Sequence, residues 1–224
     1  MANKLSIAIE VGPKGKKTVA VARDWPGLSR GATTEALAVA RLLTYVPRYA
    51  GVARFSGLNL DDGDVEVEVV ERYEGTGSTD FWGISFGFSE YDRQGVSTEE
   101  VERELSLMEA CWQFFDDVRG RVSAEMRKGP RGGGRDRDRI VQHTIGNEYD
   151  WAKGLGIRPD EEQIPATRDS LEEHREAYST AIRAHYHDGR ASGKWPLRFL
   201  IRHTAFHTLD HAWEMEDKDL TNSE

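Results

Sequence analysis

The sequence from Ser97 onward consists of four long stretches of helical character, separated by links that contain glycine or proline. Acidic residues follow Ser97, where they suit the positive end of a helix dipole. A glycine follows the second stretch as an expected C-cap, and Pro196 stands in the favoured first turn of the fourth. Four helices of similar length joined by short or moderate links are typical of a four-helix bundle. The expected helices span residues 97–127, 135–153, 167–187 and 196–218.

The first 95 residues have a different pattern, which predicts a small sheet with a helix. Leu5–Glu10 and Thr18–Arg23 are rich in Ile, Val and Ala and enclose a Gly/Pro turn, as in a hairpin. Thr33–Tyr45 has helical spacing, and 64–70 alternates acidic residues with valine, as a half-buried strand does. We expect a further strand at Phe81–Phe88. The predicted fold is therefore α+β, with an α/β sheet domain at 1–95 and an all-α bundle at 97–224.

Histidines provide the clearest chemical signal. His203, His207 and His211 recur every four residues on the fourth helix, so neighbouring pairs lie one turn apart on one face. The outer two are about 12 Å apart, which is too far for one ion to bind all three. A third ligand must come from another helix, and His143 in the second helix is the natural candidate. Spacing alone permits either His203 with His207 or His207 with His211.

Three imidazoles with an open fourth position suit a divalent ion such as zinc, nickel or iron, and we favour zinc. The open position could take water or a thiolate. Asp210 and Glu148 are the nearest acidic candidates to orient the imidazoles, with Glu214 behind them, although these acids also fit as solvated helix carboxylates. No general base can be assigned from the sequence.

Two of these helices carry a family resemblance. Arg139–Tyr149 resembles the histidine helix of the DinB/YfiT-like family, and His203–Asp217 resembles its paired-histidine helix. The resemblance implies that His143, His207 and His211 hold the metal. The choice of His207 with His211, and not His203 with His207, rests on this resemblance alone. It also implies a metal-dependent thiol S-transferase or thiol-dependent isomerase, with a low-molecular-weight thiol and an electrophile as small-molecule partners.

A second resemblance lies in the N-terminal part. Lys17–Leu37 is similar to the HicB antitoxin-like fold, in which a strand leads through a Pro-Gly turn to a helix that packs on the sheet. Members of that family bind a toxin and often DNA. We find no DNA-binding segment here, so we expect a structural or dimerising role, including a homodimer through open sheet edges.

Composition narrows the classes of function. The formal net charge of −9 argues against nucleic acid or an anionic membrane as a partner. Cys111 is the only cysteine, and neither a secretory signal nor an apolar membrane span is expected, which predicts a cytoplasmic protein. Gly83–Gly87 matches the GxSxG expression of hydrolases, but no helix is expected directly after it, so we interpret the match as accidental. The alternative to an enzyme is a non-catalytic metal-stabilised module, stress-associated or partner-binding.

Overall fold

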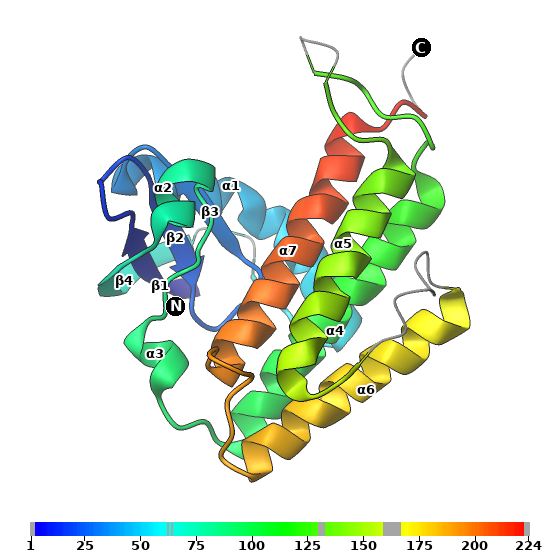
Figure 1. The fold of residues 1–224 in the computed structure, drawn as a ribbon. Coiled ribbons are helices and arrows are strands. Elements are labelled where there is room, and N and C mark those ends of the chain that lie inside the picture. Colours follow the sequence, from blue (N-terminus) through cyan, green and yellow to red (C-terminus); the bar gives the residue numbers. More distant parts are fainter. Residues whose placement is uncertain (1–2, 62, 64, 130–132, 159–166, 222–224) are drawn as a thin grey trace. The chain divides into compact units, whose positions relative to one another are not determined.

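The computed structural model describes residues 3–61, 63, 65–129, 133–158 and 167–221. The fold is mixed α+β, with a four-stranded sheet near the N-terminus followed by helices (Figure 1). The chain forms two compact units, Met1–Cys111 with Ile201–Phe206, and Trp112–Leu200 with His207–Glu224. This division falls within two long helices, and the predicted domain boundary at residues 95–97 stays a prediction.

The sheet of the first unit has the order β3-β2-β1-β4. The strands β1 (Asn3–Val11) and β2 (Thr18–Ala22) form the predicted antiparallel hairpin, and β3 (Ser29–Ala32) continues it. The edge strand β4 (Val65–Glu74) pairs in parallel with β1. Side chains along β4 alternate between partly buried and exposed, which confirms the half-buried strand expected from the Val/Glu alternation.

Helix α1 (Glu35–Ala53) packs against β2 and β3, and the 3₁₀ turn η1 (Arg54–Ser56) follows it. The Thr34 side chain caps its first turn by accepting a hydrogen bond from the Leu37 amide. The sequence predicts an end at Tyr45, but the helix continues through Pro47. We attribute the extension to burial of its last two turns, which include Tyr49, Val52 and Ala53. That burial outweighs the hydrogen bond that a proline cannot donate.

The prediction of a strand at Phe81–Phe88 is wrong. The chain instead forms two short helices, α2 (Gly77–Trp82) and α3 (Glu90–Arg93), joined by a loop. Thr76 begins α2 with a capping box, and Gly83, at φ 74°, ends it in the left-handed conformation that favours glycine. These local caps override the strand preference of the aromatic residues in this segment.

A buried carboxylate fixes the loop between α2 and α3. Glu10 on β1 is fully buried and accepts hydrogen bonds from the Ser85 hydroxyl at 2.6 Å and from the Phe86 and Gly87 amides at 3.0 Å. The Ser85 hydroxyl also accepts a hydrogen bond from Arg202 at 2.7 Å. Ser85 is only 2% exposed. Ser85 therefore stabilises the loop and is not placed as the nucleophile of a GxSxG motif.

The long helices are α4 (Thr98–Arg121), α5 (Arg137–Ala152), α6 (Arg168–His187) and α7 (Leu197–Lys218), with the 3₁₀ turn η2 (Lys153–Leu155) after α5. Each corresponds to one of the predicted helices. The first ends about six residues earlier than expected, because the chain after Arg121 pairs with the end of α7. There the Ser123 amide donates to the Asp219 carboxylate at 2.9 Å, and Met126 forms a bridge with Asp219.

Apolar clusters connect these helices within the second unit. One joins α4, α5 and α7 and the segment after α4, and a smaller one joins α5 and α6. The first contains Phe115, Val118, Val122, Met126, Ile140, Ala212 and Met215, and the second contains Ile145, Tyr149 and Leu171. Within the part of the chain that the structure describes, no helix combines the length and apolar character needed to cross a membrane.

Candidate metal centre

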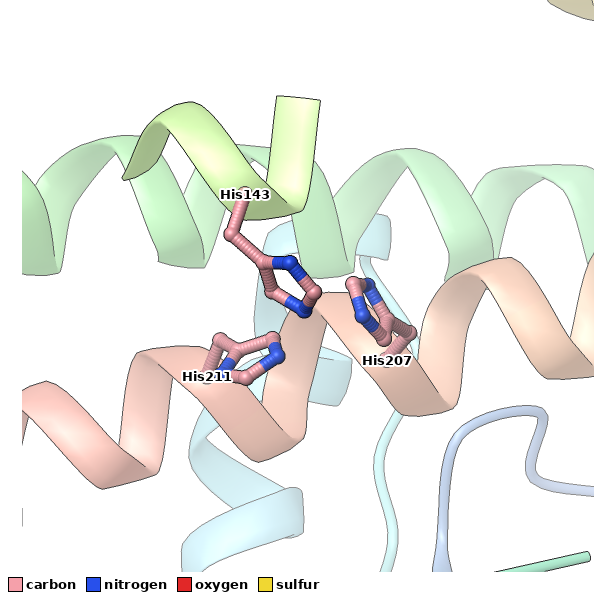
Figure 2. Close-up of side chains that lie close together, drawn as sticks. All are labelled: His143, His207 and His211. Atoms are coloured by element: carbon pink, nitrogen blue, oxygen red, sulfur yellow. The ribbon is translucent and has the colours of Figure 1, made fainter. Parts of the chain in front are cut away.

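Three histidine side chains converge between α5 and α7. His143 comes from α5, and His207 and His211 come from successive turns of α7, with their rings directed toward one another (Figure 2). One ring nitrogen of each lies within 4.8 Å of the others. The ring centroids are 5.2 Å apart for His143–His207, 4.9 Å for His143–His211 and 4.6 Å for His207–His211. These three residues lie close enough to hold a metal ion.

The fourth histidine considered, His203, lies elsewhere. It is buried in the first unit, and its ring meets the Phe86 ring edge-on at a centroid distance of 4.9 Å. The structure thus brings together His207 and His211 with His143, which is the choice that spacing alone left open. By contrast, all three converging histidines are partly exposed.

Local electrostatics keep His143 in the form that binds metals. Partial burial, followed by the positive charge of Arg135, lowers the pKa of His143 to about 4. Its imidazole is therefore neutral at neutral pH, with a lone pair available for coordination. A donor set of three imidazoles fits zinc, and it also fits nickel or iron.

Glu214 orients the His211 ring. The His211 Nδ1 atom lies 2.8 Å from a Glu214 carboxylate oxygen, and Lys218 donates to the other oxygen at 2.5 Å. The bond from His211, followed by that from Lys218, lowers the pKa of Glu214 to about 2. A carboxylate that accepts Nδ1–H leaves Nε2 as the coordinating atom of His211.

The two acids expected in this orienting role are placed differently. Asp210 is exposed on α7. Glu148 is buried in another network, where both carboxylate oxygens accept bonds from Arg175. Of the three acids considered, Glu214, three residues after His211, is the one for which the structure shows a contact with a ring of the triad. The i,i+3 spacing places Glu214 on the same face of α7 as His211.

We expect Glu214→Gln to weaken zinc binding by about 10- to 100-fold, because the ring of His211 loses its charged acceptor. Competition with a chromophoric chelator measures this affinity. Asp210→Asn is the matched control on the same helix and should change the affinity less than about twofold. Equal losses in the two variants would contradict the assignment of Glu214.

Comparison with known proteins adds no assignment. No protein-family model, curated protein or solved structure matches this chain. The DinB/YfiT-like and HicB-like resemblances therefore stay predictions, and the case for this site rests on its geometry.

Cys111 and one network of charged groups lie in the interior. Cys111 is fully buried, and burial raises the pKa of its thiol, so it remains protonated at neutral pH. A buried ion network that the sequence did not reveal joins three helices: Arg175 on α6 contacts Glu148 on α5 at 2.9 Å and Asp116 on α4 at 2.8 Å. His174, beside it, has its Nε2 atom 3.9 Å from Glu148.

Two buried histidines predict acid sensitivity of the metal-free protein. Burial, with a smaller contribution from the neighbouring arginine, lowers the pKa of His174 to about 4 and that of His203 to about 3. Below pH 6.5 the unfolded chain binds protons at these positions and the folded chain does not, so stability falls as pH decreases. We expect each to contribute a loss of about 1.6 kcal/mol in the free energy of unfolding between pH 6.5 and 5.0.

Denaturant titrations at several pH values, with a chelator present, measure this dependence. His174→Gln should remove about half of the loss that the two histidines contribute. An unfolding free energy that is constant from pH 6.5 to 5.0 would contradict the prediction.

Proposed function

We propose that this protein binds one divalent ion, zinc before nickel or iron, through His143, His207 and His211. In this proposal the ion sits in a four-helix bundle of α4, α5, α6 and α7 and serves a metal-dependent thiol S-transferase or thiol-dependent isomerase. The observation that carries the proposal is the convergence of three imidazole nitrogens within 4.8 Å, from two helices, on partly exposed side chains. The apolar clusters linking α4, α5 and α7, and α5 with α6, support the bundle.

A divalent ion bound here would supply Lewis acidity and lower the pKa of a thiol that takes the open coordination position. The chain's own residues provide the setting for this chemistry. His143 stays neutral, and Glu214 fixes the orientation of His211. The partial exposure of the three rings leaves room for a thiol and an electrophile to approach.

A non-catalytic metal-stabilised module is the second candidate, and one observation favours it. Glu214, the carboxylate that contacts the triad, is bound by both His211 and Lys218, and its pKa is about 2. It is therefore a weak base at neutral pH. Under this alternative the ion acts by holding α5 and α7 together.

A thiol-transfer assay separates the two candidates. Zinc-loaded protein is mixed with 1-chloro-2,4-dinitrobenzene and, in turn, cysteine, glutathione and 2-mercaptoethanol, and thioether formation is followed by absorbance. An enzyme gives a rate proportional to protein concentration that is lost on chelation and in His211→Ala, but kept in the control Asp210→Asn. Stoichiometric zinc without turnover for any of these thiols would favour the non-catalytic module.

A further inference from the structure

Aromatic side chains flank the histidine triad next to His207. The Trp151 ring meets the His207 ring nearly edge-on, with centroids 5.1 Å apart. The ring centroids of Trp195 and Trp151 are 6.0 Å apart, and those of Phe199 and Trp195 are 5.0 Å apart. We call Trp151 and Trp195 the aromatic face. A series of three aromatic side chains therefore begins beside His207, and it ends at Phe199, which is fully buried.

The aromatic face differs from the tryptophans of the core. Trp112 and Trp213 are 4% and 1% exposed and belong to the interior. Trp151 and Trp195 are only partly buried, and the Trp151 ring lies beside the triad. A partly buried tryptophan can offer part of its ring to a ligand, which a core tryptophan cannot.

Backbone geometry holds Trp195 in place. A tight turn joins Ser192 and Trp195 through two backbone hydrogen bonds of 2.9 and 3.0 Å, and Gly193 takes a left-handed φ of 58° in it. This turn packs closely on the end of α5: a Cβ atom at Gly154 would lie only 2.5 Å from the Ser192 hydroxyl. The glycine allows the approach, and the turn places Trp195 beside Trp151, three residues before Gly154.

The other two histidines have charged neighbours instead. The positive charge of Arg135 acts on His143, and Glu214 with Lys218 engages His211. The triad therefore has charged groups at His143 and His211 and an apolar, flat surface at His207. A ligand bound to the metal through one donor atom would therefore meet charged side chains near His143 and His211 and aromatic rings near His207.

We propose that the aromatic face binds the organic part of a small-molecule ligand whose donor atom occupies the metal, and that this part is a flat aromatic group. The proposal rests on the proposed metal site and adds the substrate class. Aromatic rings pair with Trp in stacked or edge-to-face geometry, and such pairs gain more than their buried area alone provides. A saturated or charged chain lacks this interaction.

Two hydroxamates with the same metal-binding atoms test the proposal. Calorimetric titration of the zinc-loaded protein with benzohydroxamate and acetohydroxamate compares an aromatic with a methyl substituent. We expect benzohydroxamate to bind about five- to tenfold more tightly, which corresponds to an aromatic pair. In Trp151→Ala and in Trp195→Ala the ratio should fall below about twofold. The control Trp82→Ala, whose side chain is 67% exposed in the other compact unit, should keep the preference.

Elemental analysis of each protein accompanies the titrations. Equal affinities for the two hydroxamates in zinc-loaded protein, or a preference that persists in both tryptophan variants, would overturn the aromatic face while leaving the metal site intact. Absence of zinc from the parent protein after reconstitution would overturn the metal site and, with it, this proposal. The two failures are therefore distinguishable.

Discussion

Zinc is expected to raise the thermal unfolding temperature of the metal-free protein by about 5–11 °C when free zinc is 100 times its dissociation constant. A ligand that binds only the folded state at this excess stabilises it by about 2.7 kcal/mol. A shift of about 2–4 °C per kcal/mol applies to a chain of this size. The three ligands lie on α5 and α7, so the ion would link two helices that are separated along the chain. Differential scanning calorimetry before and after reconstitution measures the shift.

Magnesium and His211→Ala provide the controls for this experiment. Magnesium prefers oxygen ligands and retains its waters, so three imidazoles should bind it poorly and the unfolding temperature should stay unchanged. His211→Ala leaves two ligands and should lose most of the zinc-dependent shift. Equal stabilisation by zinc in the parent protein and in His211→Ala would show that the ion acts elsewhere.

The second large effect, on the free energy of unfolding, is expected from breaking the buried ion pair of Glu148 and Arg175. Arg175 donates from Nε to one Glu148 oxygen at 2.9 Å and from Nη2 to the other at 3.2 Å, and Glu148 is 1% exposed. Burial raises the pKa of Glu148, and the Arg175 charge opposes that rise. Arg175→Ala leaves a buried carboxylate without its cation, which we expect to lower the free energy of unfolding by about 3–5 kcal/mol.

A surface pair and a double substitution test the physical cause. Arg168 and Glu172 form a helix pair with side chains 84% and 64% exposed, so Arg168→Ala should cost less than about 0.5 kcal/mol. Replacing both buried partners, Glu148→Leu with Arg175→Met, should cost less than Arg175→Ala alone, because no fully buried charge is left unpaired. Asp116, the other partner of Arg175, is partly exposed and keeps its ion pair with Arg119 at 2.9 Å. Denaturant titration measures all three. A double variant that is less stable than Arg175→Ala would contradict this explanation.

The long elements were predictable from sequence because periodicity and caps agree over many residues. The α6 helix illustrates this, since Thr167 caps it as expected and it ends at His187. The short segment around Phe81–Phe88 was not predictable in the same way. Its aromatic residues favour a strand, but capping at Thr76 and bonds from the loop to the buried Glu10 decide its conformation. Glu10 lies more than seventy residues away, beyond the reach of a local pattern.

In the candidate site, too, local spacing predicted part of the arrangement and tertiary packing decided the rest. Spacing on one helix identified the histidines and showed that a ligand from another helix was needed, but it could not choose between the two possible pairs. That choice depends on which face of α7 meets α5. Spacing also could not rank the three acidic candidates for orienting the imidazoles, for a related reason. Glu148 looked suitable by its nearness to His143 along the helix, yet it faces Arg175 on α6, and only tertiary packing reveals this.

Metal content after reconstitution with zinc and removal of excess metal tests the central claim most directly. Elemental analysis should give about one zinc per chain in the parent protein and in His203→Ala. It should give substantially less in His143→Ala, His207→Ala and His211→Ala, because each removes one of only three ligands. Zinc that is absent from the parent protein, or retained fully in all three ligand variants, would contradict the metal centre proposed here.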